Sequence, residues 1–192
     1  MRRNGRSGAA ELLLFASNFI RHPHMLGSII PSSRYLVNQV LAPVDWERAT
    51  VIVEYGPGVG TFTAEILRRM RPDARLVVFE TNSNFVQHLR DSMTDPRLHI
   101  EHASAAEVQT VIERLGLPRP AYIISGIPLG SMPVPLQAEI VGKTREALAP
   151  GGEFHVYQFT SRVLPVLQKT FQHVRRSVER RNLPPAQLFV CA

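Results

Sequence analysis

The stretch VEYGPGVGTF, residues 53–62, decides the fold. Three glycines stand at every second position of it: Gly56, Gly58 and Gly60. The β-branched run at 50–55 predicts a buried strand, and the segment at 61–70 predicts a helix. Open parallel sheets bind ligands at the carboxyl ends of their strands, where glycines let the backbone turn sharply and approach a ligand closely. The stretch therefore predicts a ligand site between a strand and a helix.

The residues around these glycines indicate which ligand it is. The pattern is not the dinucleotide signature G-x-G-x-x-G, because Thr61 stands where the third glycine belongs. The carboxylate of Glu54 would repel a pyrophosphate and attract a positively charged nucleoside. S-adenosylmethionine carries a sulfonium and an amino group and no phosphate, so Glu54 is expected near its amino-acid end. The alternative is a plain strand-to-helix turn with an incidental acid.

The next two strands supply further cofactor contacts. Glu80 ends the predicted strand 75–80, where an acid roughly 20 residues past the glycine loop accepts hydrogen bonds from both ribose hydroxyls. We expect Thr81 beside it, although Glu80 also fits the role of a helix-capping acid. Methyltransferases that bind S-adenosylmethionine in this way often have an acid after the third strand, beside the amino group of the adenine. Ser104 occupies that place here and is expected to hydrogen-bond or to cap a helix.

Strand and helix patterns alternate along most of the chain, which predicts a parallel sheet covered on both faces. The expected strands are 50–55, 75–80, 97–103, 121–127 and 153–160, and the expected helices are 61–70, 82–93, 105–115 and 135–148. The last two strands, 171–181 and 186–192, are joined by a short turn and are therefore antiparallel. The fold class is α/β: a Rossmann-like seven-stranded sheet in which the last strand runs against the rest.

The fourth strand leads into SGIPLGSMP, residues 125–133. Ser125, Gly126 and Ile127 are expected near the methyl group that is transferred, where carbonyls and a turn held by Pro128 would bind an amine acceptor. An ordinary proline-rich loop is the alternative. An ammonium acceptor must first lose a proton, so a base or a water path is required. Tyr35 is the favoured residue for this step; the other candidates are His22, His24, His155 and Tyr157.

Composition is that of one globular domain, with 44% hydrophobic and 20% charged residues in a chain of 192. No apolar run reaches the roughly 18 residues of a membrane span. The short apolar run near the start contains Glu11, which argues against a secretory signal. Cys191 is the only cysteine and excludes an internal disulfide, which favours the cytoplasm. No metal site is expected.

Charge is distributed unevenly along this chain of net charge +6. Residues 1–34 carry net +4 and residues 162–192 net +5, whereas the middle carries net −3. Basic ends attract anionic surfaces, although solubility alone also explains them. Residues 8–21 predict an amphipathic helix, and a second helix is expected from Ser33 to Leu41 with Ser32 or Ser33 as its cap. The single domain 1–192 is therefore expected to place a helical cap (1–45) on a core (46–192).

Taken together, these segments resemble the small bacterial phospholipid N-methyltransferases that methylate phosphatidylethanolamine. The resemblance covers nearly the whole chain and rests on GSIIPSSRYL (27–36), VEYGPGVGTFT (53–63), FETN (79–82), SGIPLGSMP (125–133), YQFT (157–160) and LPPA (183–186). It implies a seven-stranded methyltransferase fold and transfer of up to three methyl groups from S-adenosylmethionine, with S-adenosylhomocysteine as product. It also implies an N-terminal amphipathic helix that meets the membrane. We further expect a monomer or weak oligomer in the cytoplasm, associated with the anionic inner face of the cell membrane.

Ribosomal RNA adenine dimethyltransferases look like the nearest relatives of that family. Their motif after the fourth strand, N-[IL]-P-[YF], corresponds here to Gly126-Ile127-Pro128-Leu129, without the asparagine or the aromatic on which a flipped adenine stacks. They also look larger at the C-terminus, so no stable nucleic acid partner is expected, and RNA adenine methylation stays the runner-up. A third alternative is a lipid-surface binding protein with weak catalysis, to which Ser104 points.

Overall fold

The computed structural model describes residues 33–192, so the helix expected over residues 8–21 lies outside the described residues. The second expected helix is confirmed as α2 (Arg34–Leu41). Ser33 caps it, because its side-chain oxygen accepts a hydrogen bond from the backbone N–H of Leu36 at 3.2 Å.

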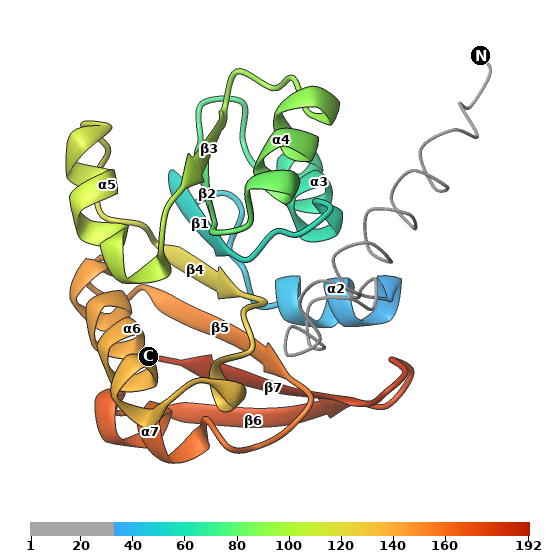
Figure 1. Ribbon diagram of the computed structural model, residues 1–192, viewed down its shortest axis with the longest axis vertical. Helices are drawn as coiled ribbons and strands as arrows, with labels where there is room; N and C mark the ends of the chain where they lie inside the picture. Colours follow the sequence, from blue (N-terminus) through green and yellow to red (C-terminus); the bar gives the residue numbers. More distant parts are fainter. Residues whose placement is uncertain (1–32) are drawn as a thin grey trace.

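The centre of the fold is one seven-stranded sheet with the strand order β3-β2-β1-β4-β5-β7-β6 (Figure 1). Its strands are β1 (Val51–Tyr55), β2 (Arg75–Glu80), β3 (Leu98–His102), β4 (Tyr122–Ser125), β5 (Glu153–Gln158), β6 (Val174–Glu179) and β7 (Ala186–Cys191). Strand β7 pairs antiparallel with both β5 and β6, whereas β1 to β5 pair in parallel. The predicted Rossmann-like methyltransferase sheet with a reversed last strand is therefore confirmed.

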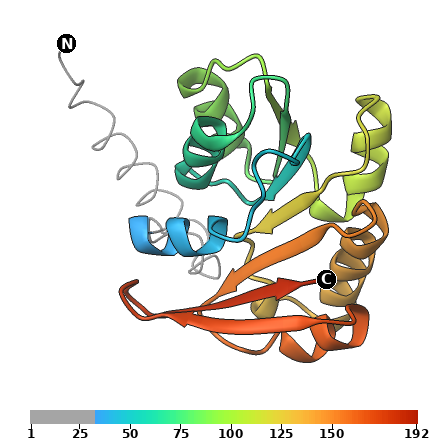
Figure 2. The same ribbon diagram turned by 180° about the vertical axis from the view of Figure 1, so that it is seen from behind.

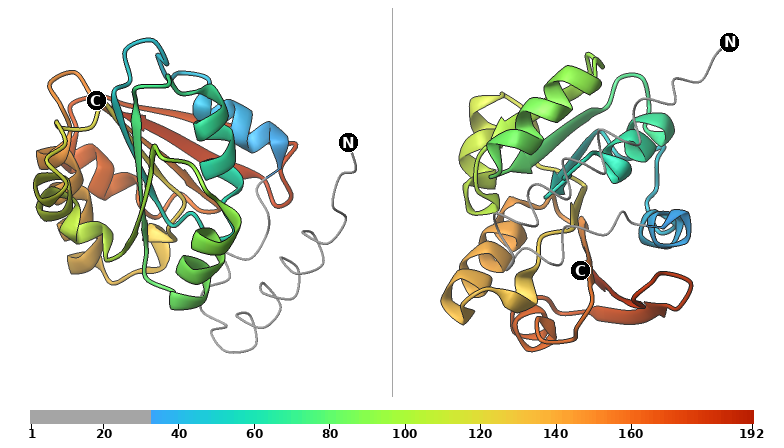
Figure 3. Two further views of the ribbon diagram at one scale, coloured as in Figure 1. Left: turned by 90° about the horizontal axis from the view of Figure 1, so that it is seen from above. Right: turned by 45° about the vertical axis from the view of Figure 1, so that its right-hand side comes forward.

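Helices cover both faces of the sheet, as Figures 1 and 2 show. One face packs against α2, α3 and α4, and the other against α5, α6 and α7 (Figure 3). Their bounds are α3 (Thr61–Arg69), α4 (Ser83–Ser92), α5 (Val108–Arg114), α6 (Val134–Ala147) and α7 (Leu164–Thr170), with short 3-10 helices η2 (Ala105–Glu107) and η3 (Leu129–Ser131). No helix in the part of the chain that the structure describes has the length and hydrophobicity needed to cross a membrane.

Strand β1 shows why the run before the glycines is apolar almost throughout. Val53 and Tyr55 belong to the core under α5 and α6, and Ile52 belongs to the core under α2 and α3. A strand buried on both faces has no polar side, which is the sequence signature of a parallel sheet. Glu54 points to the same face as Ile52 because side chains alternate along a strand. This alternation brings its carboxyl group to α3.

Two local features differ from the sequence expectation. Strand β4 ends at Ser125 and not at residue 127, because the chain leaves the ladder after the bond from Gly126 to Tyr55 and Pro128 has no N–H to donate. Helix α7 occupies a segment for which the sequence predicts no helix. Its seven residues include Pro165 in the first turn, where the missing N–H costs nothing, and are too few to show a clear helical period.

Candidate active site

Strands β1 and β4 are neighbours, and the chain leaves them toward opposite sides of the sheet. Such a switch point is where open α/β sheets form their ligand crevice. The backbone N–H of Gly126 donates to the carbonyl of Tyr55 at 2.9 Å, and that of Gly56 donates to the carbonyl of Phe79 at 2.9 Å. These bonds hold the loops after β1, β2 and β4 side by side.

Two glycines of the loop after β1 are required by their protein neighbours. Gly56 has φ +70° and Gly60 has φ +86°, a conformation that side chains rarely adopt. A Cβ at Gly56 would lie 2.7 Å from Cγ2 of Ile127, and a Cβ at Gly60 would meet the methyl group of Met93. The outer glycines of the motif therefore serve the turn and its close packing.

Gly58 differs, because a Cβ there would meet nothing within 4 Å. Its φ is +56° and its backbone N–H donates to Oε2 of Glu80 at 3.3 Å. The middle of the loop thus faces open space directly beside a carboxylate. This is the place where a ligand can approach both the backbone and Glu80.

Glu80 is 7% exposed and ends β2 as expected. Its Oε1 accepts from the N–H of Asn82 at 2.9 Å. Burial raises the pKa of this carboxyl, and bonds from the N–H groups of Asn82 and Gly58 oppose the shift. A carboxylate has about four acceptor positions, so capacity remains for two ribose hydroxyls. Thr81 follows it, and its carbonyl is 3.1 Å from Nε2 of His102.

Glu54 is the second buried carboxyl beside the loop, at 3% exposure. The hydroxyl of Thr63, in the first turn of α3, donates to its Oε2 at 2.7 Å. Burial raises the pKa of Glu54 to about 8, and the nearby Glu80 adds to the rise, while the Thr63 bond opposes it. A ligand with a cationic amino group would reverse this balance by favouring the ionised form.

Ser104 closes a helical turn in this structure. Its hydroxyl accepts from the N–H of Ala106 at 3.2 Å, and its own N–H donates to Oε1 of Glu107 at 2.8 Å. This arrangement is a capping box at the start of η2, and Ser104 and Glu107 have its sequence pattern S-x-x-E. The bond brings the carboxylate of Glu107 next to Ser104, which stands where many methyltransferases have an acid beside the adenine amino group.

The loop after β4 is held by a residue that the sequence analysis missed. Gln158 ends β5 and is 6% exposed. Its Nε2 donates to the carbonyl of Ile127 at 2.8 Å, and its Oε1 accepts from the N–H of Gly130 at 3.1 Å. One side chain therefore braces both ends of this loop. No local signal marks it, because its partners are 31 and 28 residues away.

Ser125 lies at the base of the same loop and is fully buried, yet its hydroxyl has no hydrogen-bond partner among the described residues. Leu129 is also fully buried and belongs to the core beside α6. One buried hydroxyl group at the base of this loop is therefore left without a partner among the described residues, which a buried water could supply.

Tyr157 of β5 joins this site, whereas Tyr35 makes its contacts elsewhere. The Tyr157 ring stacks on Phe62 of α3 with centroids 5.0 Å apart, and its hydroxyl would touch a Cβ placed on Gly126. The guanidinium groups of Arg34 and Arg181 lie over the ring of Tyr35, at 5.0 and 4.4 Å from its centroid. The structure therefore places Tyr157, and not Tyr35, beside the loop after β4.

The remaining base candidates are placed as follows. His155 is 1% exposed, with Nδ1 3.0 Å from the carbonyl of Val40 and Nε2 2.8 Å from Oε2 of Glu153, so both of its ring nitrogens are occupied. His22 and His24 lie outside the described residues.

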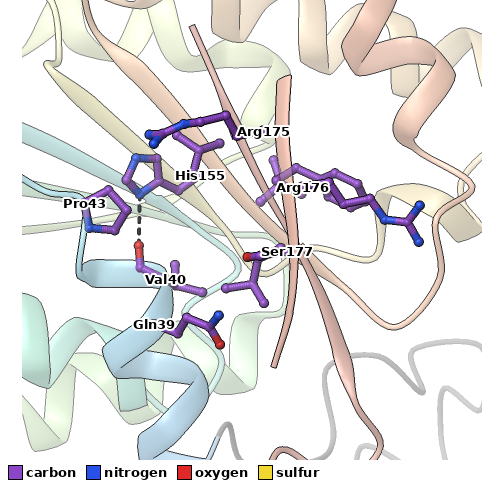
Figure 4. A pocket seen from close by; sticks show the side chains of 11 residues that line it. Gln39, Val40, Pro43, His155, Arg175, Arg176 and Ser177 are labelled. Atoms are coloured by element: carbon purple, nitrogen blue, oxygen red, sulfur yellow. Dashed lines mark hydrogen bonds between the residues drawn. The ribbon is translucent and has the colours of Figure 1, made fainter. Parts of the chain in front are cut away.

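A pocket of about 360 Å³ lies between α2 and the strands β5, β7 and β6 (Figure 4). Gln39, Val40, His155 and Arg175 are among the residues that line it. None of the residues predicted to bind the cofactor or to lie near the methyl group lines this pocket, so it is separate from the crevice between β1 and β4.

The residues at the crevice fit S-adenosylmethionine. Gly58 leaves room for close approach, Glu80 offers acceptor positions for a ribose, and the raised pKa of Glu54 is the kind that a cationic amino group would lower. The unpartnered hydroxyl of Ser125 lies at the base of the neighbouring loop. The sequence prediction of this cofactor therefore agrees with the geometry.

Comparisons with known proteins identify the family. The family model described as ribosomal RNA adenine dimethylase matches residues 15–180. An ornithine lipid N-methyltransferase of Singulisphaera acidiphila is 30% identical over 189 residues, covering 94% of this chain and 95% of that protein.

Two solved structures share the fold at low sequence identity. The N-methyltransferase NodS of Bradyrhizobium japonicum, in complex with S-adenosylhomocysteine, has a TM-score of 0.65 at 13% identity and covers 96% of this chain and 97% of its own. A precorrin-6y C5,15-methyltransferase of Geobacter metallireducens has a TM-score of 0.65 at 15% identity and covers 83% and 88%. The chain belongs to the ribosomal RNA adenine dimethylase family and is an S-adenosylmethionine-dependent N-methyltransferase.

Proposed function

We propose that this protein methylates the primary amine of a membrane lipid. Phosphatidylethanolamine is the acceptor that the sequence motifs favour, and ornithine lipid is the second candidate, because a relative that is similar over almost the whole chain is named for it. Both candidates present an aliphatic amine on a lipid, which is the chemistry that the site must accept.

The observation that carries this proposal is that Leu129 is fully buried in the core. In the RNA enzymes an aromatic at this place stacks on the flipped adenine. Neither the type nor the position of Leu129 provides a platform for a base. Gly126 stands where those enzymes have asparagine, and its Cα faces the hydroxyl of Tyr157 closely. A slender amine suits such a crevice better than a purine does.

For this methyl transfer, the protein mainly has to position the amine in line with the methyl group of the cofactor. The cofactor supplies the methyl group as a sulfonium, and an amine with a free lone pair displaces it in line. An aliphatic ammonium has a pKa of about 10, so it must lose a proton before it reacts. We assign Tyr157 to orient the amine through its hydroxyl oxygen, while Gln158 holds the carbonyl of Ile127 and the N–H of Gly130 in the loop after β4. The released proton leaves by water or by a base outside this set.

The test offers labelled S-adenosylmethionine to the purified full chain together with one acceptor at a time. The acceptors are vesicles that contain phosphatidylethanolamine, vesicles that contain ornithine lipid, and ribosomal RNA. Thin-layer separation shows which lipid carries the label. We expect label in lipid, and label only in RNA would overturn the proposal in favour of the runner-up. No transfer to any acceptor, despite cofactor binding, would favour a lipid-surface binding protein instead.

The proposal also places the protein on the cytoplasmic face of the cell membrane, because its acceptor resides there. The predicted amphipathic helix at residues 8–21 is the proposed contact, with Leu12, Phe15, Phe19 and Ile20 on its apolar side. Flotation of the Phe15→Glu/Phe19→Glu variant with anionic vesicles tests this contact. Undiminished flotation by a folded, cofactor-binding variant would exclude it.

A further inference from the structure

The turn between β6 and β7, residues 180–185, exposes an unusual set of side chains, and we call it the hairpin tip. Leu183 is 84% exposed, the highest value among the large hydrophobic residues that the structure describes. Pro184 and Pro185 follow it and are also exposed. Prolines are common in turns, but a leucine exposed to this extent beside them gives the hairpin an apolar end.

The hairpin tip is anchored from below. Asn182 is 3% exposed, its Oδ1 accepts from the backbone N–H of Ser33 at 3.1 Å, and its Nδ2 donates to the carbonyl of Pro184 at 2.8 Å. Glu179 is equally buried and accepts from the N–H of Arg181 at 2.7 Å. Asn182 and Glu179 are buried while Leu183 is exposed, so the exposure of Leu183 follows from how the turn is anchored.

Basic residues surround the apolar end. Arg34 of α2 and Arg180 and Arg181 of the turn are exposed, and the guanidinium groups of Arg34 and Arg181 lie over the ring of Tyr35. The acid in this group, Glu179, is buried and pairs with Arg181 at 3.0 Å. An apolar turn surrounded by arginines and a tyrosine is complementary to an anionic lipid surface. The arginines match the layer of phosphates, and the apolar residues match the acyl chains below it.

The hairpin tip lies at the edge of the sheet that carries the active site. Gln187 of β7 pairs with Gln158, the last residue of β5, so the turn extends beyond the carboxyl end of β5. Figure 1 shows it projecting past the ends of β4 and β5, next to the start of α2. Docking through this turn would hold the loop after β4 near the surface in which a lipid amine resides.

We propose that the hairpin tip is a membrane-docking element for anionic phospholipid. Leu183, Pro184 and Pro185 enter the headgroup region, and Arg34, Arg180 and Arg181 bind lipid phosphates. This contact is additional to the helix proposed at residues 8–21. Its use in catalysis rests on the proposed function, but binding itself does not.

The test measures flotation of the full chain with phosphatidylcholine vesicles that contain increasing amounts of phosphatidylglycerol. Neither lipid has an amine that could accept a methyl group, so binding is measured apart from catalysis. We expect Leu183→Glu and Arg180→Glu each to lower the bound fraction about fivefold or more at low salt. The controls are Gln168→Glu, which changes the charge by as much as Leu183→Glu, and Lys169→Glu, which matches Arg180→Glu. Both lie on α7, near the end of β6 opposite the hairpin tip, and are expected to float like the parent. Thermal unfolding and cofactor binding show that each variant is folded.

Two results would overturn the proposal. One is undiminished flotation of both hairpin variants. The other is a loss confined to Arg180→Glu together with an equal loss of RNA binding, which would mark a general polyanion surface. The result is independent of methyl transfer: hairpin-dependent flotation stands even if no lipid is methylated. If both proposals hold, Leu183→Glu loses activity on vesicles and keeps it on detergent-dispersed acceptor.

Discussion

At the scale of single residues, two carboxyl groups beside one loop are given different properties by their partners. Glu80 accepts hydrogen bonds from two backbone N–H groups, whereas Glu54 accepts one from the hydroxyl of Thr63. Burial is the main cause of a raised pKa in both. The better-solvated Glu80 suits the neutral hydroxyls of a ribose, and Glu54 suits a group that brings a positive charge.

Replacing Glu80 tests the ribose contact. We expect Glu80→Ala to weaken S-adenosylhomocysteine binding by about 1–3 kcal/mol, because ligand hydroxyls would lose buried acceptors. Calorimetry measures the change. The control is Asp91→Ala, which removes a carboxylate near the end of α4 that is bonded by Gln87 and is expected to leave affinity unchanged. Equal affinity in the parent and in Glu80→Ala would remove Glu80 from the site.

The pKa of Glu54 makes stability depend on pH. An acid whose pKa rises on folding holds its proton in the folded state, so its contribution is complete below its ordinary 4.5 and is lost as pH rises through about 8. Between these values, Glu54 lowers the free energy of unfolding of the cofactor-free protein by up to about 1.4 kcal/mol per pH unit. Glu54→Gln mimics the protonated form and should flatten this part of the profile.

Urea unfolding at several pH values measures the difference in slope between Glu54→Gln and the parent. Glu65→Gln is the matched control, because bonds from Arg68 and Arg69 lower the pKa of Glu65 to about 2, outside this range. Parallel profiles for the parent and Glu54→Gln would show that Glu54 does not keep its proton on folding.

At the scale of elements, the β4 loop depends on β5 for its shape. β4 ends at Ser125, and the chain then turns over the crevice through η3 with few partners of its own. Gln158 supplies hydrogen bonds to Ile127 and Gly130 from the neighbouring strand. A positioning residue of this kind acts through the loop and does not touch the acceptor.

Removing this brace separates positioning from cofactor binding. We expect Gln158→Ala to lower kcat on the order of tenfold, because misplacement of the loop disturbs the approach of the amine, and to leave S-adenosylhomocysteine affinity close to that of the parent. Gln187→Ala is the control, since Gln187 pairs with Gln158 in the sheet but bonds Arg176 on the surface. An unchanged kcat for Gln158→Ala would show that the loop holds its shape without the brace.

At the scale of the whole molecule, the sheet places the proposed cofactor loops and the proposed docking turn at the same end of its strands. The cofactor loops follow β1, β2 and β4, and the hairpin tip extends from the far side of the sheet beyond β5. Seven strands pair into one continuous unit between them. The sheet therefore fixes the position of these loops relative to the hairpin tip.

Cofactor binding should protect one of these regions and not the other. Saturation with S-adenosylhomocysteine at a hundred times its dissociation constant stabilises the folded state by about 2.7 kcal/mol. In hydrogen exchange, we expect slower exchange at Gly58, Asn82 and residues 126–131, and no local slowing at 180–185 beyond that of the whole domain. Strong protection confined to 180–185 would contradict both assignments.

The sequence alone determined the features that depend on local pattern. Alternating glycines at 56, 58 and 60 require a turn with positive φ, and buried runs between helices require a parallel sheet. Glu54 and Glu80 were readable because each lies at the end of such a run. The caps at Ser33 and Ser104 agree with the sequence expectation, because a serine directly before a helical run commonly caps it.

Only the tertiary structure decided what distant segments bring together. Gln158 and Tyr157 reach the β4 loop from another strand, and Tyr35 turns to the hairpin through contacts with Arg181. The exposure of Leu183 depends on the anchor between Asn182 and Ser33, which are 149 residues apart. Local propensity carries no information about such pairs, because sheet order and packing set them once the whole chain has folded.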